Sequence, residues 1–333
     1  MTTKLIEVDS LDIHVLINDE IDQISPSPNP RVQHAQSFAG VPLSLVPDPS
    51  SRGGALLEMP MRNICCGAHG LSLFITAKKD DKSQTLLFDA GPEEHVFEKN
   101  VQRLKLPMTE IGAIVLSHWH RDHSGGLLSA IRLAGNGRSD GDQLIVALPP
   151  DKPAFRGIMF DQPISLEADP TTDEISSAGG STVILDEALT VLDDAFLISG
   201  EIPRQTEYEG GIPGGVRYDP AKDIWIKDEL IMEERFVMYK GLVIFTGCSH
   251  AGLINIAIHA KTIDDSPIYA IVGGYHLADA SPEKMEQSMK DLKDLEPALL
   301  MPGHCTGWRF KGLIEKEMPG QMAPIFGGTK YTL

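Results

Sequence analysis

The stretch Ser117-His118-Trp119-His120-Arg121-Asp122-His123-Ser124-Gly125-Gly126 places three histidines and one aspartate within six positions. The apolar, β-branched run at residues 111–116 predicts a buried strand that ends at Ser117, and the apolar spacing of residues 125–133 predicts a helix. Imidazole nitrogen and carboxylate oxygen are ligands that divalent metals such as zinc prefer. The stretch therefore predicts a metal site on a loop between a strand's carboxyl end and a helix's amino end, where α/β folds place their sites.

The spacing of these residues predicts how they would hold metal. His118 and His120 are two residues apart, so in extended backbone their side chains point the same way and can hold one ion. Asp122 and His123 follow where the chain turns, so they can face a second ion. Two ions about 3.5–4 Å apart activate a bridging water for hydrolysis. We expect one or two zinc ions, with iron or manganese compatible with the same ligand types, and Asp122 as the catalytic group that orients the attacking water or accepts its proton.

Composition narrows the class of protein. The chain has 333 residues, 42% of them hydrophobic, which suits a globular protein with a sizeable core. Its 29 basic and 47 acidic residues give a net charge of −18, which disfavours nucleic acid as a partner. Four cysteines without framework spacing, no apolar signal segment and no apolar run of membrane-spanning length predict a cytoplasmic enzyme with a small-molecule substrate and no membrane partner. The oligomeric state stays open.

The rest of the chain predicts alternating strands and helices with two irregular insertions. Residues 18–60 contain seven prolines and predict a lid or a plain surface insertion, while the glycine-rich residues 200–230 predict a second irregular segment. In that segment Arg204 and Arg217 are candidates for an anionic substrate group or solvated charges. Helices are expected at residues 92–106, after His250, and from a Ser281 cap with Pro282 at its first position. Further strands are expected at residues 11–17, 71–76, 85–88, 144–148, 235–239, 242–245, 269–272 and 298–301, and, in a second sheet, at 182–185, 189–192 and 196–198.

Several motifs resemble a known superfamily. Residues 116–127, Leu-Ser-His-Trp-His-Arg-Asp-His-Ser-Gly-Gly-Leu, resemble the metal-binding signature of the metallo-β-lactamase fold superfamily. Further stretches resemble one branch of this superfamily, the proteins similar to 7,8-dihydropterin-6-methyl-4-(β-D-ribofuranosyl)aminobenzene-5'-phosphate synthases. These stretches are LLFDAG at 86–91, SGEIPR at 199–204, TGCSHAG at 246–252, GGYHL at 273–277 and PGHCTG at 302–307. The resemblance implies an α/β protein with four layers, αββα, in which two mixed sheets lie between helices. It implies a single domain over residues 1–333 with insertions at about 18–60 and 200–230.

The resemblance also implies the remaining site residues. His304 resembles the superfamily's last histidine ligand, and His250 stands in for the third histidine of the first site or for a shared position. Asp89 is expected to support a ligating imidazole from behind. His276 is expected behind the ligands or facing the substrate.

The chain departs from the superfamily pattern in one motif. Where relatives carry a separate bridging aspartate after a Thr-Gly strand end, this chain has Cys248-Ser249-His250. The bridging ligand is therefore open, with Glu201 and Cys248 as candidates. Imidazole reaches further than a thiol, so we expect His250 to be the ligand and Cys248 to pack behind it.

Three functions remain from these observations. The leading one is a metal-dependent hydrolase whose metal-bound hydroxide attacks a small lactam, lactone, ester or phosphoester. The branch resemblance implies an alternative, a dihydropterin-phosphate synthase-like transferase, which needs a phosphate pocket that this acidic chain shows only weakly. The third is a non-catalytic ligand-binding or sensor protein on the same fold, against which the intact ligand cluster argues.

Overall fold

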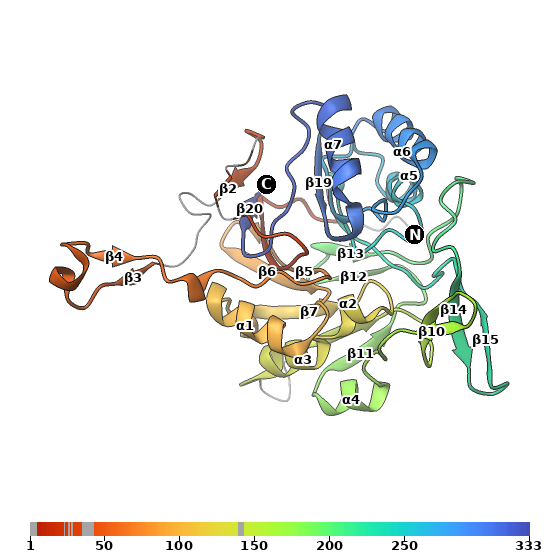
Figure 1. Ribbon diagram of the computed structural model, residues 1–333, viewed down its shortest axis with the longest axis horizontal. Coiled ribbons are helices and arrows are strands. Elements are labelled where there is room, and N and C mark those ends of the chain that lie inside the picture. Colours follow the sequence, from red (N-terminus) through yellow and green to blue (C-terminus); the bar gives the residue numbers. More distant parts are fainter. Residues whose placement is uncertain (1–4, 23, 26, 28, 35–42, 139–142) are drawn as a thin grey trace.

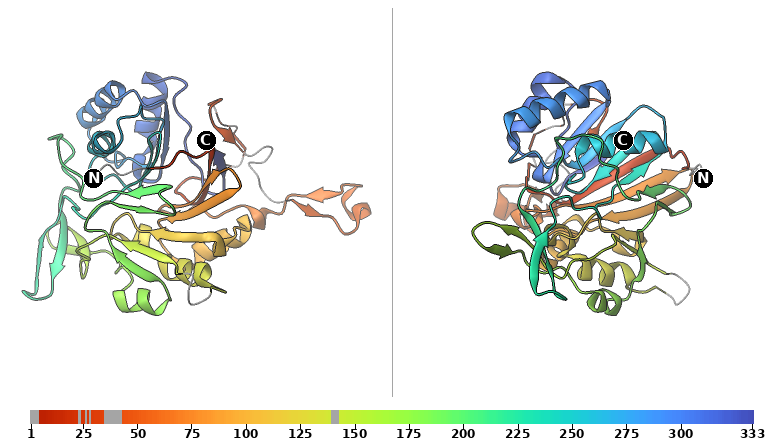
Figure 2. Two further views of the ribbon diagram at one scale, coloured as in Figure 1. Left: turned by 180° about the vertical axis from the view of Figure 1, so that it is seen from behind. Right: turned by 90° about the vertical axis from the view of Figure 1, so that its right-hand side faces the viewer.

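The computed structural model describes residues 5–22, 24–25, 27, 29–34, 43–138 and 143–333. Its centre is two stacked β-sheets whose facing sides share one apolar core, including Ile13, Phe88, Phe196 and Phe245. Helices cover the outer face of each sheet, with α5, α6 and α7 on one side and α1, α3 and α4 on the other (Figure 1). The turned views show the same layering (Figure 2). The four-layer α/β architecture expected from the sequence is thus confirmed.

The first sheet has eight strands in the order β11-β8-β7-β6-β5-β1-β20-β2. Neighbours from β6 to β11 are parallel and the remaining pairs are antiparallel. The strands are β1 (Ser10–Ile17), β2 (Gln33–His34), β5 (Ser72–Lys79), β6 (Lys82–Phe88), β7 (Ile111–Val115), β8 (Ile145–Leu148), β11 (Ser181–Ile184) and β20 (Lys330–Thr332). Its helices are α1 (Glu94–Leu104), α2 (Arg121–Ser124), α3 (Leu127–Gly135) and α4 (Thr172–Ser177), with a 3₁₀ turn η4 (Met108–Glu110).

The second sheet has six strands in the order β12-β13-β16-β17-β18-β19. They are β12 (Leu189–Val191), β13 (Phe196–Ile198), β16 (Val237–Tyr239), β17 (Val243–Thr246), β18 (Ala270–Gly274) and β19 (Leu299–Gly303). The covering elements are α5 (Leu253–Ile263), α6 (Pro282–Asp294), the 3₁₀ turn η5 (His304–Thr306) and α7 (Trp308–Glu317). Helix α6 begins as expected, because the Ser281 hydroxyl accepts a hydrogen bond from the Lys284 N–H and Pro282 follows it.

The parallel strands decide where a site can form. In the first sheet Phe88 pairs with Val115 and Val115 with Ala147, so β6, β7 and β8 end at one edge. In the second sheet β17, β18 and β19 end together in the same way. The loops that follow parallel strands meet at such an edge. All of the candidate ligand loops begin there.

Three expectations about strands are wrong. The strand expected at residues 182–185 does not join the second sheet, because β11 pairs in parallel with β8 in the first. The strand expected at residues 298–301 is not the last one, as its final place among the expected strands implied, because β20 follows it and pairs with β1. Residues 200–230 are not wholly irregular, since β14 (Gly215–Asp219) and β15 (Ile224–Lys227) form a four-stranded sheet with β9 (Arg156–Met159) and β10 (Pro163–Ser165). These pairings join segments far apart in sequence, which strand patterns alone do not specify.

The proline-rich insertion contains a projecting hairpin. Strands β3 (Ser44–Leu45) and β4 (Leu57–Glu58) pair around the 3₁₀ turn η2 (Pro49–Arg52), and the turn η3 (Met61–Asn63) follows. The hairpin extends away from the sheets (Figure 1). Residues 23, 26, 28 and 35–42 of this insertion lie outside the described residues. None of the helices that the structure describes has the length and apolar character needed to cross a membrane.

Candidate metal centre

Three imidazoles from two sheets form a first group of ligand-type atoms. His118 and His120 lie on the loop after β7, and His250 lies on the loop after β17. His118 Nε2 is 2.9 Å from His120 Nδ1, and His250 Nε2 is 3.2 Å from each of these nitrogens. All three side chains are buried. The sequence expected all three histidines at the metals, and the structure brings them to one point.

A second group lies beside the first and combines Asp122, His123, Cys248 and His304. His123 Nε2 is 3.1 Å from Cys248 Sγ and 3.2 Å from His304 Nε2. Cys248 Sγ is 3.2 Å from His304 Nε2, and so is Asp122 Oδ2. The ring centroids of His118 and His123 lie 4.4 Å apart, so the two ligand groups are directly adjacent.

Both groups suit a divalent cation. A tetrahedral zinc ion with bonds of about 2.0–2.1 Å to nitrogen separates its nitrogen ligands by roughly 3.3 Å, close to the spacings of the first group. A neutral imidazole has one N–H and one lone pair, so three nitrogens that face one another lack the protons to satisfy all of their contacts. A cation between them removes this conflict. The second group offers nitrogen, sulfur and carboxylate oxygen, which zinc also accepts.

Burial keeps the first group in the form that binds metal. It lowers the pKa of His118 and His250 well below the usual value, and that of His120 to about 3. The neutral imidazole, which is the ligating form, therefore predominates near neutral pH. Burial alone would raise the pKa of Asp122, but the imidazoles of His123 and His304 outweigh it and hold that pKa well below its usual range. Asp122 is accordingly a carboxylate.

Hydrogen bonds from behind orient the ligands. The Asp89 carboxylate accepts from the Ser117 N–H at 2.7 Å and from its hydroxyl at 2.8 Å, and it contacts His123 Nδ1 at 2.6 Å. Because Asp89 holds Nδ1 of His123, the other ring nitrogen, Nε2, faces the second group. A carboxylate that supports a metal-binding histidine orients the ring in the same way. Gly247 lets the β17 loop approach closely, since a Cβ there would lie 2.2 Å from the Ser117 hydroxyl oxygen.

Cys248 does not pack behind His250 as the sequence suggested. Its Sγ faces His123 and His304 in the second group, while His250 faces the first. Residues two apart at a strand end can converge on one side, and here they reach two adjacent groups instead. Glu201 is exposed and joins neither group among the described residues. The Cys248 thiol thus belongs to the second group, and the identity of a bridging ligand stays a prediction.

Other candidates lie around the two groups. The ring of His276 makes an edge-to-face contact with that of His250, with centroids 4.3 Å apart and an interplanar angle of 68°. A ring nitrogen of His276 also lies close to the thiols of Cys248 and Cys305. Arg204 donates to the His250 carbonyl oxygen, and Arg217 forms an ion pair with Asp151. The charge of Arg217 is thus paired with a carboxylate, whereas Arg204 donates to backbone carbonyl oxygens. All four cysteines carry free thiols.

Sequence reasoning missed Asp19, His69 and Cys305. Asp19 Oδ1 lies 2.9 Å from His304 Nδ1, so it supports His304 as Asp89 supports His123. Asp19 Oδ2 contacts His69 Nδ1 at 3.0 Å, and His69 lies over the second group with Nε2 3.7 Å from Asp122 Oδ2. The sequence offered one indication of the role of Asp19, namely its position just after the first strand. Because the sequence pattern places that position in the proline-rich insertion, Asp19 is not among the predicted site residues.

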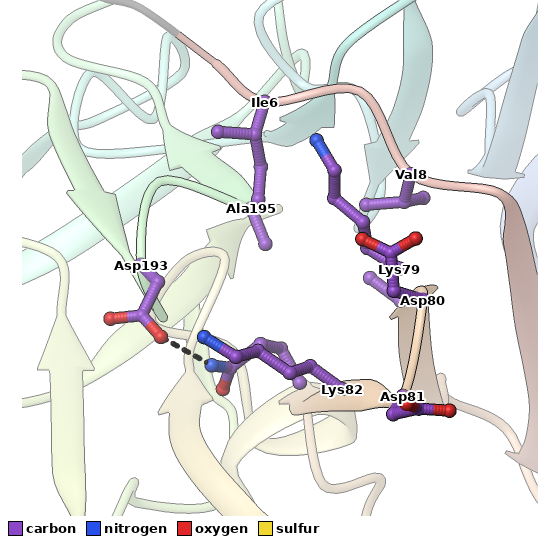
Figure 3. A pocket seen from close by; sticks show the side chains of 10 residues that line it. Ile6, Val8, Lys79, Asp80, Asp81, Lys82, Asp193 and Ala195 are labelled. Carbon is purple, nitrogen blue, oxygen red and sulfur yellow. Dashed lines mark hydrogen bonds between the residues drawn. The ribbon is translucent and has the colours of Figure 1, made fainter.

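The cavity in Figure 3 is a separate feature. It measures about 390 Å³ and lies between the N-terminal segment with Ile6 and Val8 and the β5–β6 turn with Lys79 to Lys82. Gln84 donates a hydrogen bond to Asp193 along its wall. No residue of either ligand group lines this cavity.

Comparison with solved structures identifies the fold of this chain. No family model matches the chain. A metal-dependent hydrolase of the β-lactamase superfamily has a solved structure that superposes with a TM-score of 0.65 and 21% identity, covering 96% of this chain and 98% of that one. The metallo-β-lactamase fold protein YhfI from Bacillus subtilis gives a TM-score of 0.51 at 10% identity, with 96% and 98% covered. The chain therefore has the metallo-β-lactamase fold.

Sequence relatives place it further. A protein of Methanocaldococcus jannaschii, 7,8-dihydropterin-6-methyl-4-(β-D-ribofuranosyl)-aminobenzene-5'-phosphate synthase, is 25% identical over 270 residues, covering 78% of this chain and 88% of the relative. An uncharacterised protein of the same organism is 30% identical over 252 residues, covering 72% and 85%. Both cover most of the fold, so the similarity extends well beyond the His-rich loop.

Proposed function

We propose that this protein is a metal-dependent hydrolase that acts on a small lactam, lactone, ester or phosphoester. One observation carries the proposal: two adjacent groups of buried ligand-type atoms meet where the loops of two sheets converge. Divalent ions bound there would polarise a substrate oxygen and lower the pKa of water for attack on it. The net charge of −18 favours a small-molecule substrate over nucleic acid.

The protein's own residues divide the remaining work. His118, His120 and His250 would hold one ion, while His123, Cys248 and His304 would hold the other. Asp122, a carboxylate at the edge of the second group, is placed to orient the attacking water or accept its proton.

Metal content and turnover test this proposal together. We expect the purified protein to hold one or two transition-metal ions per chain, and the double variant His118→Ala, His120→Ala to lose at least one. Asp122→Asn should remain folded and lose about 100-fold or more of its turnover on a panel of esters, lactones and phosphodiesters. His95→Ala, an exposed histidine of α1, is the matched control and should keep metal and activity. Full metal occupancy in the double variant would refute the ligand assignment.

A synthase-like transferase is the second candidate, and the similarity to the named synthase favours it. In that case the same groups would serve a reaction in which an arylamine ribosyl phosphate is the nucleophile. Incubation with the arylamine ribosyl phosphate and a dihydropterin that carries a leaving group on its 6-methyl carbon, followed by mass spectrometry of the coupled product and of the released leaving group, separates the two functions. A coupled product without hydrolysis of the ester, lactone and phosphodiester panel would replace the hydrolase proposal with this one.

A further inference from the structure

The first ligand group forms only if two loops that follow strands of different sheets keep a fixed position relative to each other. His118 and His120 come from the eight-stranded sheet, and His250 comes from the six-stranded sheet. Their facing nitrogens lie 2.9–3.2 Å apart. A shift of about 1 Å between the loops would spoil ligand geometry, which tolerates deviations of about 0.5 Å.

Three consecutive residues, Glu233, Glu234 and Arg235, contact both loops. We call residues 233–235 the clasp. The Arg235 N–H donates to the Ser117 carbonyl oxygen at 2.8 Å. Glu233 Oε1 accepts from the Trp119 N–H at 3.4 Å and from the Arg156 guanidinium at 2.8 Å. The clasp therefore binds the His118–His120 loop immediately before and between its two histidines.

Glu234 binds the other loop. Its Oε1 accepts from the His250 N–H at 3.0 Å, and its Oε2 accepts from the Ala251 N–H at 2.6 Å. Only 1% of Glu234 is exposed, so water does not compete for these bonds. A carboxylate is an acceptor at both oxygens, and such charge-assisted bonds are stronger than neutral ones. Glu234 thus fixes the backbone of His250 itself.

The clasp is also continuous with the second sheet. It leads directly into β16, which pairs antiparallel with β17 through Val237 and Phe245, and β17 delivers the loop with His250. The clasp is therefore joined to the second sheet through Phe236, while the Arg235 amide is bonded to the loop of the first sheet. This is a direct tie between the two sheets at the ligand edge.

We propose that Glu234 is a positioning residue for the first ligand group. By holding the His250 backbone in the clasp, it sets the imidazole against those of His118 and His120, so metal affinity at this group depends on it. The inference rests on the metal centre of the proposed function.

The test is metal affinity, measured by competition titration of zinc or cobalt against a chromophoric chelator. In Glu234→Gln one oxygen becomes an NH₂ group that faces a backbone N–H, so one bond is lost and two donors oppose each other. We expect one ion to bind about 10–100-fold more weakly, as when other supporting partners of metal ligands are changed, and the other ion to be unaffected. Glu234→Asp keeps the carboxylate but draws it back, and its affinity should lie between those of the wild type and Glu234→Gln.

Glu209→Gln is the matched control. Glu209 is also a buried glutamate, 4% exposed, and accepts from two backbone N–H groups, those of Ile254 and Asn255 at 2.9 and 3.0 Å. These donors belong to α5 and not to the ligand loop. We expect Glu209→Gln to lower the melting temperature but to keep wild-type metal affinity.

The outcomes are distinguishable. Wild-type affinity in Glu234→Gln, or equal losses of affinity in Glu234→Gln and Glu209→Gln, would overturn the positioning role while leaving the metal centre intact. A wild-type protein that binds no ion would refute the proposed function and the positioning role with it. If Glu234→Gln does not fold, the comparison of Glu234→Asp with Glu209→Gln decides by the same criteria.

Discussion

The thiol of Cys248 lies close to the imidazoles of His123 and His304. The sulfur–nitrogen distances are similar to the 2.9–3.2 Å that separate the imidazole nitrogens of the first group. The Sγ atom of Cys248 is 3.1 Å from His123 Nε2 and 3.2 Å from His304 Nε2. Burial raises the pKa of the Cys248 thiol, so without a metal ion it would be protonated. A bound cation displaces that proton, because the thiolate is the ligating form.

We therefore predict that Cys248 is a ligand of the second group and not a residue that packs behind His250, while His250 remains a ligand of the first group. Cobalt-substituted wild type should show a thiolate-to-cobalt charge-transfer band, and Cys248→Ser should lose it. His250→Ala should keep the band while it loses the other ion, because His250 faces the first group. A wild-type cobalt protein without this band would return Cys248 to the role of a packing residue.

At the scale of elements, one buried carboxylate joins three strands of the first sheet. Asp12 of β1 accepts from Lys78 of β5 at 2.6 Å and from Thr332 of β20 at 2.6 Å, and it pairs with Lys330 at 2.9 Å. Burial alone would raise the pKa of Asp12, but these partners outweigh it and lower the pKa to about 2. The strand β20, which the sequence did not predict, is thereby fixed to β1.

Asp12→Asn should lower the free energy of unfolding by about 1.5–3 kcal/mol at neutral pH, the usual contribution of a hydrogen bond to a charged group. The folded pKa is depressed, so the stabilisation is present above the unfolded value near 3.8 and is lost as the pH falls from there through about 2. Urea unfolding of both proteins from pH 7 to pH 2 measures this. A difference that persists unchanged at pH 2 would show that packing, and not charge, explains the effect.

At the scale of the whole molecule, the β3–β4 hairpin is the part that lies furthest from the core (Figure 1). Leu45, Leu56 and Leu57 are 79%, 68% and 52% exposed. The triple change of these leucines to alanine should alter the stability by no more than about 0.5 kcal/mol per site, and the metal content should not change.

The buried Leu73 of β5 provides the contrast, since Leu73→Ala should cost about 2–5 kcal/mol. Differential scanning calorimetry and elemental analysis measure both effects. A loss of several degrees in melting temperature for the hairpin variant would mean that these leucines are covered in solution.

The local sequence determined the parts of the fold that depend on neighbouring residues. The run before Ser117 gave a strand, and Ser281 with Pro282 gave the start of α6, because strand and cap preferences act over a few positions. The spacing of the histidines predicted that His118 and His120 face one point and that Asp122 and His123 face a second, and the structure places the two pairs in two adjacent groups.

Only the tertiary structure decided which residues meet across the sheets. Three features depend on how the two sheets are placed relative to each other. Cys248 and His250 reach different ligand groups, Asp19 contacts His304 from behind, and the clasp contacts both ligand loops. Hydrophobic patterns specify which face of a strand is buried but not which distant strand it pairs with, as β11 and β20 show. The partners of each ligand are therefore a property of the packed molecule, because long-range contacts, and not local preferences, hold them in place.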